Sequence, residues 1–94
     1  MKIRTKEERD KIVNDFAELM KEQLDANTDK DDWSEQERLY LFALMAKEVG
    51  KIGRELAYFI RGGRYVRRGC ANIANYAMMI AQHRGGDHIP PAKQ

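Results

Sequence analysis

The chain is poor in cysteine and proline, with one cysteine and two prolines among 94 residues. A single cysteine, Cys70, cannot form an internal disulfide, so the sequence predicts a protein of a reducing cytoplasm. No apolar run reaches the length of about 18 residues that a transmembrane helix needs. Residues 1–11 are dominated by charge and lack the apolar stretch of a signal peptide. A disulfide-stabilised secreted domain is thereby excluded, and a protein without a membrane partner is expected.

The chain also has no large excess of positive or negative charge, because its net charge is only +2. Acidic residues outnumber basic ones in residues 1–48, whereas basic residues outnumber acidic ones in residues 49–94. This split either creates a basic ligand surface or gives two complementary halves that attract one another within a bundle or between subunits. With so small a net charge, nucleic acid is not the expected partner.

The periodicity of the chain predicts three helices. Thr5 and Glu8 have the spacing of a capping box, and Ser34 and Glu37 repeat it, so the first two helices are expected to begin there. Gly62-Gly63 separates the second helix from the third. The first helix is expected to end near Asn27, the second to extend through Ile60, and the third to span Tyr65–Arg84.

Each predicted helix carries a stripe of apolar or small residues. The stripes are Ile12, Phe16, Met20 and Leu24; Leu41, Leu44, Val49, Ile52, Leu56 and Ile60; and Val66, Cys70, Ile73, Ala77 and Ile80, with Ala71, Ala74 and Ala81 beside the last. Gly50 and Gly53 are expected to let another helix approach closely. These patterns predict one all-α domain over residues 1–84, followed by a flexible tail over residues 85–94. So short a chain buries little surface alone, so a bundle completed by oligomerisation is expected.

Three blocks of the sequence resemble the phage-type MazG nucleoside triphosphate pyrophosphohydrolases. They are Phe16-Ala17 with Met20, Leu24, Asn27, Lys30 and Trp33; Glu48-Val49-Gly50; and Cys70 to Ala81. The resemblance covers Ile12 to Arg84. It implies a MazG-like helical bundle that pairs as a dimer or a dimer of dimers, with Mg²⁺ held between two helices. The activity it implies is hydrolysis of nucleoside triphosphates to monophosphate and pyrophosphate.

The acidic motif of that family is altered in this chain. The family pattern is Glu-Glu-x-x-Glu on one helix and Glu-x-x-Asp on the next, which offers Mg²⁺ the oxygen ligands it prefers. The matching residues here are Lys47, Glu48, Lys51, Gly69 and Asn72. The sequence therefore predicts a catalytically degenerate protein with no catalytic residue and no cofactor, and Glu48 is a weak metal candidate. The alternative is a residual Mg²⁺-dependent hydrolase in which Glu55 replaces a lost ligand.

A second interpretation of these changes is gained binding chemistry. Lys47, Lys51 and Arg54 share one stripe of a helix, where they could contact phosphates directly. A solvated basic face, structural bracing by the asparagines and core packing of the aromatic residues remain the simpler alternatives. The predicted nucleotide-binding residues are Lys47, Lys51, Arg54, Arg68, Asn72, Asn75, Trp33 and Tyr76.

Four arginines surround Gly62-Gly63, namely Arg61, Arg64, Arg67 and Arg68. A glycine-rich turn that enters a helix can present backbone N–H groups to an anion. The favoured function is metal-independent capture of a nucleotide or nucleotide signal, as a phage protein directed against a host defence would need. The alternative is a protein-interaction module that inhibits a host enzyme or defence complex through these arginines, and a solvated loop explains them as well.

Overall fold

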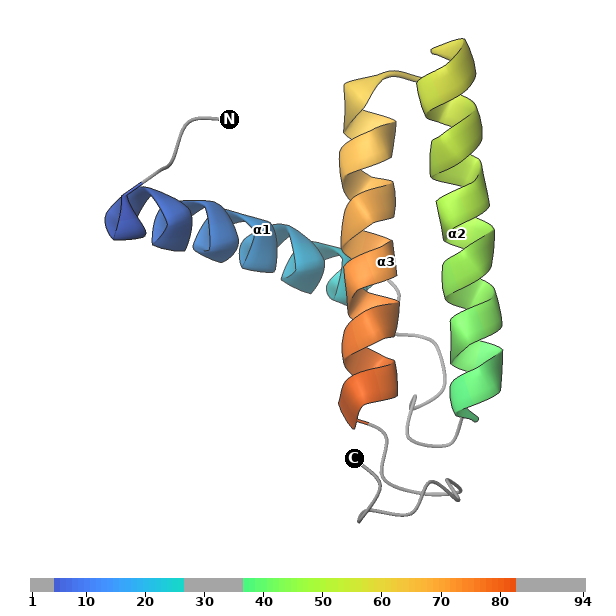
Figure 1. The fold of residues 1–94 in the computed structure, drawn as a ribbon, viewed down its shortest axis with the longest axis horizontal. Helices are drawn as coiled ribbons and strands as arrows, with labels where there is room; N and C mark the ends of the chain where they lie inside the picture. Colours follow the sequence, from blue (N-terminus) through green and yellow to red (C-terminus); the bar gives the residue numbers. More distant parts are fainter. Residues whose placement is uncertain (1–4, 27–36, 83–94) are drawn as a thin grey trace.

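The structure, a computed structural model, describes residues 5–26 and 37–82. These residues form three α-helices and no strand: α1 (Lys6–Ala26), α2 (Arg38–Tyr58) and α3 (Gly63–Gln82). The last two form an antiparallel hairpin, and α3 lies between α2 and α1 (Figure 1). The all-α prediction is confirmed for this part of the chain. The predictions made for Trp33, Ser34 and residues 85–94 lie outside the described residues.

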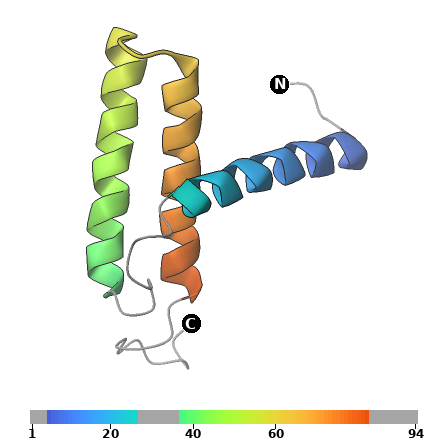
Figure 2. The ribbon, with the colours of Figure 1, turned by 180° about the vertical axis from the view of Figure 1, so that it is seen from behind.

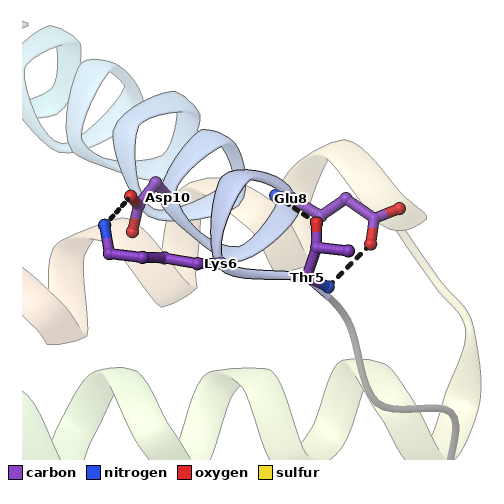
Figure 3. Close-up of polar contacts among 4 residues, drawn as sticks. All are labelled: Thr5, Lys6, Glu8 and Asp10. Carbon is purple, nitrogen blue, oxygen red and sulfur yellow. Dashed lines mark hydrogen bonds and ion pairs between the residues drawn. The ribbon is translucent and has the colours of Figure 1, made fainter.

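The first helix begins at the predicted capping box. The backbone N–H of Glu8 donates to Thr5 Oγ1 over 3.1 Å, and the backbone N–H of Thr5 donates to Glu8 Oε1 over 2.8 Å (Figure 3). Lys6 and Asp10, one turn apart on the exposed surface, form an ion pair of 2.8 Å. Local sequence therefore specifies the start of α1, because these contacts need no other part of the fold.

The C-terminal end of α1 lies against α3, and the rest of α1 projects away from the hairpin (Figures 1 and 2). None of its residues is buried. Only the later part of its predicted stripe, Met20 and Leu24, is half-buried, whereas Ile12 and Phe16 are exposed. The helix is held by a long-range contact, in which the Asn75 side chain donates from Nδ2 to the backbone carbonyl of Met20 over 3.0 Å.

The connection between α2 and α3 is organised by Glu55. Phe59 adopts a left-handed conformation (φ 53°), and its N–H donates to the Glu55 carbonyl over 2.8 Å. The carboxylate of the same glutamate accepts the backbone N–H groups of Arg61 and Gly62. The left-handed residue ends the helix at Tyr58, so the predicted extension through Ile60 is wrong. The third helix then begins at Gly63, two residues before the predicted start.

The hydrophobic core between the helices is small. Its buried apolar residues among those described are Leu41, Ile52 and Ala71, and the buried polar residues are Glu55 and Asn75. The predicted stripe of α2 is partly wrong, because Val49 and Leu56 are exposed. A spacing of three to four residues is compatible with two adjacent faces of one helix, and the predicted stripe combined the face toward α3 with the one beside it. In α3, Ala77 and Ala81 are exposed for the same reason.

The glycines of α2 do not mark a close approach within the chain. A Cβ at Gly53 would meet nothing within 4 Å, and one at Gly50 would meet only Arg54, at 3.8 Å. No helix among the described residues therefore approaches these two glycines, and the predicted close approach of another helix stays a prediction for a second copy of the chain. The closely approached glycine is Gly69 on α3, whose Cβ would overlap Cδ1 of Ile52.

Candidate functional site

Glu48, the acidic residue among those that the resemblance aligns with the metal motif, lies in a polar contact between α2 and α3. Its Oε1 accepts a hydrogen bond of 3.4 Å from Asn72 Nδ2, and its Oε2 lies 3.2 Å from Lys51 Nζ. The lysine neutralises the carboxylate, and the asparagine joins the two helices. Glu48 and Asn72 thus connect α2 and α3 as partners in a hydrogen bond.

Tyr76 lies beside this polar contact and is half-buried. Burial raises the pKa of its hydroxyl above 10.0, and the nearby Glu48 and Tyr40 raise it further, while Lys51 lowers it. Each of these effects acts on the phenolate, which burial and negative charge disfavour and a cation favours. Tyr76 is therefore part of the packed helix pair, with its ring partly exposed.

The residues at the family's metal position do not fit a Mg²⁺ centre. Gly69 lies against Ile52, so a carboxylate at this position would have no room. The Glu55 carboxylate, the suggested replacement ligand, is 4% exposed and accepts the N–H groups of Arg61 and Gly62 over 2.6 and 2.7 Å. Within residues 5–26 and 37–82, no three His, Cys, Asp or Glu side chains come together. The donor set gives Mg²⁺ too few oxygen ligands.

The same hydrogen bonds change the interpretation of the glycine-rich turn. Its N–H groups were expected to bind an external anion, but those of Arg61 and Gly62 already bind the chain's own carboxylate. A buried carboxylate that accepts two backbone N–H groups is well satisfied. The turn is therefore a structural junction, and these two N–H groups are not available to an external anion.

A pocket of about 330 Å³ lies beside this junction. Three cationic side chains and two tyrosine rings line it, together with Glu55 and Ile60. Its cations are Lys51, Arg54 and Arg61, and its tyrosines are Tyr58 and Tyr65. The pocket is open to solvent, since Tyr58 and Ile60 of its lining are 70% and 72% exposed, and its volume is at the lower end of the range of small-molecule sites, which begins at about 300 Å³. The guanidinium of Arg61 lies 4.9 Å from the centre of the Tyr65 ring, a cation–π contact that orients it.

The structure brings together only part of the predicted binding set. Lys51 and Arg54 line the pocket, whereas Lys47 and Arg68 are exposed and do not contribute to its lining. Asn75 is buried and bound to Met20, so its role is structural bracing. Two further arginines of the turn, Arg64 and Arg67, are exposed outside the pocket.

The nucleotide-binding set predicted from the sequence did not include Arg61, Tyr58 or Tyr65, which line the pocket. A signal for them was present, because Lys51, Arg54 and Tyr58 follow one another at helical spacing on α2, and Arg61 and Tyr65 are four residues apart. The turn between the helices brings the two groups together. That turn depends on Glu55, whose buried position could not be seen in the sequence pattern.

Comparisons with family models, with curated proteins and with solved structures return no significant match to this chain. The likeness to MazG-type enzymes stays a resemblance carried by the three sequence blocks. Among the helices that the structure describes, none is long and apolar enough to cross a membrane.

Proposed function

We propose that this protein binds a phosphorylated small molecule of the nucleotide class, without a metal ion, in the pocket formed by Lys51, Arg54 and Arg61. The observation that carries the proposal is the pocket itself, in which three cations line a volume of about 330 Å³. Phosphate oxygens accept hydrogen bonds from guanidinium and ammonium groups, and arginine can bind two of them at once.

The electrostatic balance of the pocket supports an anionic ligand. Glu55 is the one acidic residue in the lining, and its Oε2 is engaged by two backbone N–H groups. The pocket has three positively charged side chains and one carboxylate that is already hydrogen-bonded, so its electrostatic potential is positive. A positive potential attracts anions more strongly in a concave site than on a flat surface. Phosphate groups supply the matching charge.

The aromatic residues suit the other part of a nucleotide. Tyr58 and Tyr65 line the pocket beside the cations. A base can stack on such rings, which in single-stranded nucleic acid complexes is worth about 1–3 kcal/mol per base. In this proposal the two tyrosines take the place of Trp33 and Tyr76, the aromatic residues that the sequence suggested.

Capture without hydrolysis is the activity that this chemistry supports. The carboxylates that would hold Mg²⁺ in the resembled family are replaced, and Glu55 holds the turn of the hairpin. The protein would act as a homo-oligomer that sequesters or senses a nucleotide signal, as a phage protein acting on a host defence would. Residual hydrolysis has no support from the donor set.

The test compares variants that reverse charge inside and outside the pocket. Arg54→Glu and Arg61→Glu are expected to weaken binding of ATP, measured by titration calorimetry in the presence of a chelator, by about tenfold or more, which corresponds to about 1.4 kcal/mol. Arg9→Glu on α1 makes the same substitution at an exposed residue outside the pocket and should leave the affinity unchanged. Equal affinities in all three variants would overturn the proposal.

A second candidate, a protein-interaction surface, is favoured by the exposure of Arg64, Arg67 and Arg68 outside the pocket. Three unburied guanidinium groups on the first turns of one helix could bind an acidic protein surface. This candidate predicts that a partner from host lysate is retained by Arg54→Glu and lost when these three arginines are replaced together. Retention by the triple variant would reject it.

A further inference from the structure

One face of α2 is apolar, uncharged and uncovered. We call it the outer face. Its large side chains are well exposed, with Leu39 at 75%, Phe42 at 53%, Val49 at 51% and Leu56 at 57%. Its small residues are Ala43, Ala46, Gly50, Gly53 and Ala57. None of the residues on this face between Leu39 and Ala57 is charged, and the Arg54 guanidinium lies at its edge, beside Gly50. In a chain of which 34% is charged, this marks the face as a contact surface.

The chain itself offers nothing to cover the outer face within the described residues. In both views α1 lies against α3 and extends from it in the direction away from α2 (Figures 1 and 2). The face that α2 turns toward α3 is a different one, marked by Leu41, Ile52 and Glu55. A Cβ at Gly53 would stand in open space. A glycine in an exposed helix interior costs about 1 kcal/mol relative to alanine, and the single chain shows no compensation for it.

The outer face has the spacing of a coiled-coil seam. Six of its residues, Leu39, Phe42, Ala46, Val49, Gly53 and Leu56, follow one another at alternating intervals of three and four. This is the repeat that keeps one stripe of a helix against a second helix along its length. Ala46 and Gly53 are small and lie between large residues of the seam. The large side chains project from the helix, and the small residues leave room for side chains of a partner helix.

The order of large and small residues fits a second copy of the same helix in the antiparallel direction. In that arrangement Phe42 meets the partner's Gly53, Val49 meets the partner's Ala46, and Leu39 meets the partner's Leu56. All six positions are used, and the two-fold axis gives each contact twice. A parallel pair would set Phe42 on the partner's Phe42 and leave a gap where the partner's Gly53 faces Gly53. Uniform packing therefore favours the antiparallel pair.

We infer that the outer face of α2 binds a second copy of this chain, antiparallel, in a two-fold dimer in which Phe42 packs over the partner's Gly53. The inference extends the proposed oligomer to a defined surface and does not depend on the ligand pocket. Lys51 and Tyr58 of that pocket lie on another face of α2, whereas Arg54 lies at the edge of the outer face, with its Nη1 3.8 Å from the place of a Cβ on Gly50. The small core of each chain, three buried apolar residues among those described, gains the apolar burial that it lacks.

The oligomeric state of matched variants tests this inference. The wild-type protein should have twice the sequence mass by sedimentation equilibrium. Val49→Glu should raise the dimer dissociation constant by about thirtyfold or more, the effect of losing a central contact. Val13→Glu places the same substitution at a valine of α1 that is 65% exposed, and it should leave the dimer intact. A monomeric wild type, or dissociation by Val13→Glu but not by Val49→Glu, would overturn the inference.

Two further measurements keep the test decisive if Val49→Glu fails to fold. Gly53→Leu adds a side chain where the single chain has open space, so its circular dichroism should remain helical while the dimer dissociates. A disulfide experiment tests whether the two α2 helices run antiparallel. One variant carries Leu39→Cys and the other Leu56→Cys, each also with Cys70→Ser, and the two proteins are mixed and oxidised. The antiparallel pair predicts disulfides between the two kinds of chain. Predominant Leu39→Cys self-crosslinking, or a dimeric Gly53→Leu protein, contradicts the proposed geometry. None of these outcomes depends on nucleotide binding.

Discussion

The side chain of Ile52 fills the place where a Cβ on residue 69 would lie. A Cβ built on Gly69 would overlap Cδ1 of Ile52 and lie 2.9 Å from its Cγ1. Gly69 and Asn72 are the residues that the resemblance aligns with the two acidic positions of the second metal-binding helix. At the first of them, the Ile52 side chain occupies the place of a Cβ, so a larger residue there requires Ile52 to move.

Gly69→Ala should therefore destabilise the protein. Overpacking of a buried site costs about 1–3 kcal/mol, which should exceed the higher helix propensity of alanine. Urea unfolding followed by circular dichroism measures the change. Ile52→Val removes the overlapping Cδ1 atom, so the double variant should lose less stability than the two single variants added together. Gly63→Ala, where a Cβ meets nothing within 4 Å, is the control and should change little. If the stability losses of the two single variants add up to that of the double variant, the Ile52 side chain does not restrict the size of residue 69.

Glu55→Ala should destabilise the junction between α2 and α3. The carboxylate is buried and accepts the N–H groups of Arg61 and Gly62. Hydrogen bonds to charged groups contribute about 1.5–3 kcal/mol, so a loss of this size is expected in urea unfolding. Glu55→Gln keeps an acceptor oxygen without the charge and should lie between the wild type and alanine. If both variants unfold at the wild-type urea concentration, the carboxylate does not hold the turn.

Asn75→Asp should release α1 from the hairpin. The Asn75 amide donates to the Met20 carbonyl, and a carboxylate at this position cannot donate and would repel that oxygen. Hydrogen exchange should become faster in the second half of α1 while the α2 and α3 amides remain protected. Asn72→Asp, a half-buried position that contacts Glu48 instead, serves as the comparison and should not change exchange in α1. Uniformly faster exchange in all helices would contradict a local role for Asn75.

We expect the protein to lose stability at alkaline pH because of the environment of Tyr76. Its folded-state pKa is raised above the unfolded value of 10.0, first by burial and then by Glu48 and Tyr40. The folded state thus holds the proton more tightly than the unfolded state does. The stabilisation is fully present below pH 10 and is lost as the pH rises through the folded-state pKa. Unfolding of the wild type and of Tyr76→Phe should be compared across this range. The phenylalanine variant should lose less stability, and parallel curves would reject the assignment.

The sequence was sufficient for those parts of the fold that local interactions determine. The Thr5 and Glu8 pair specifies the start of α1 by contacts three residues apart, and the Gly62-Gly63 break correctly separates two helices. The end of α2 was misplaced because Ile60 continues an apolar period. The residue that ends the helix, Phe59, adopts a left-handed conformation that side-chain type does not suggest.

The candidate site could be predicted only in part. Lys51 and Arg54 were found because helical spacing places them on one stripe. Arg61 lines the pocket because the turn between α2 and α3 places it there. The hydrogen bond from its N–H to the Glu55 carboxylate, which holds that turn, forms only in the folded junction. Val49 and Leu56 were assigned to the core, since periodicity identifies an apolar face but not which partner covers it. Their exposure is the basis for the proposed dimer.

The most direct test of metal-independent capture is titration calorimetry of the wild-type protein with ATP and with pyrophosphate in excess chelator, followed by chromatography of the recovered nucleotide. The account predicts binding of at least one of these anions with no products, and no gain in affinity when Mg²⁺ replaces the chelator. Binding that appears only with Mg²⁺, or conversion of ATP to monophosphate and pyrophosphate, would contradict it.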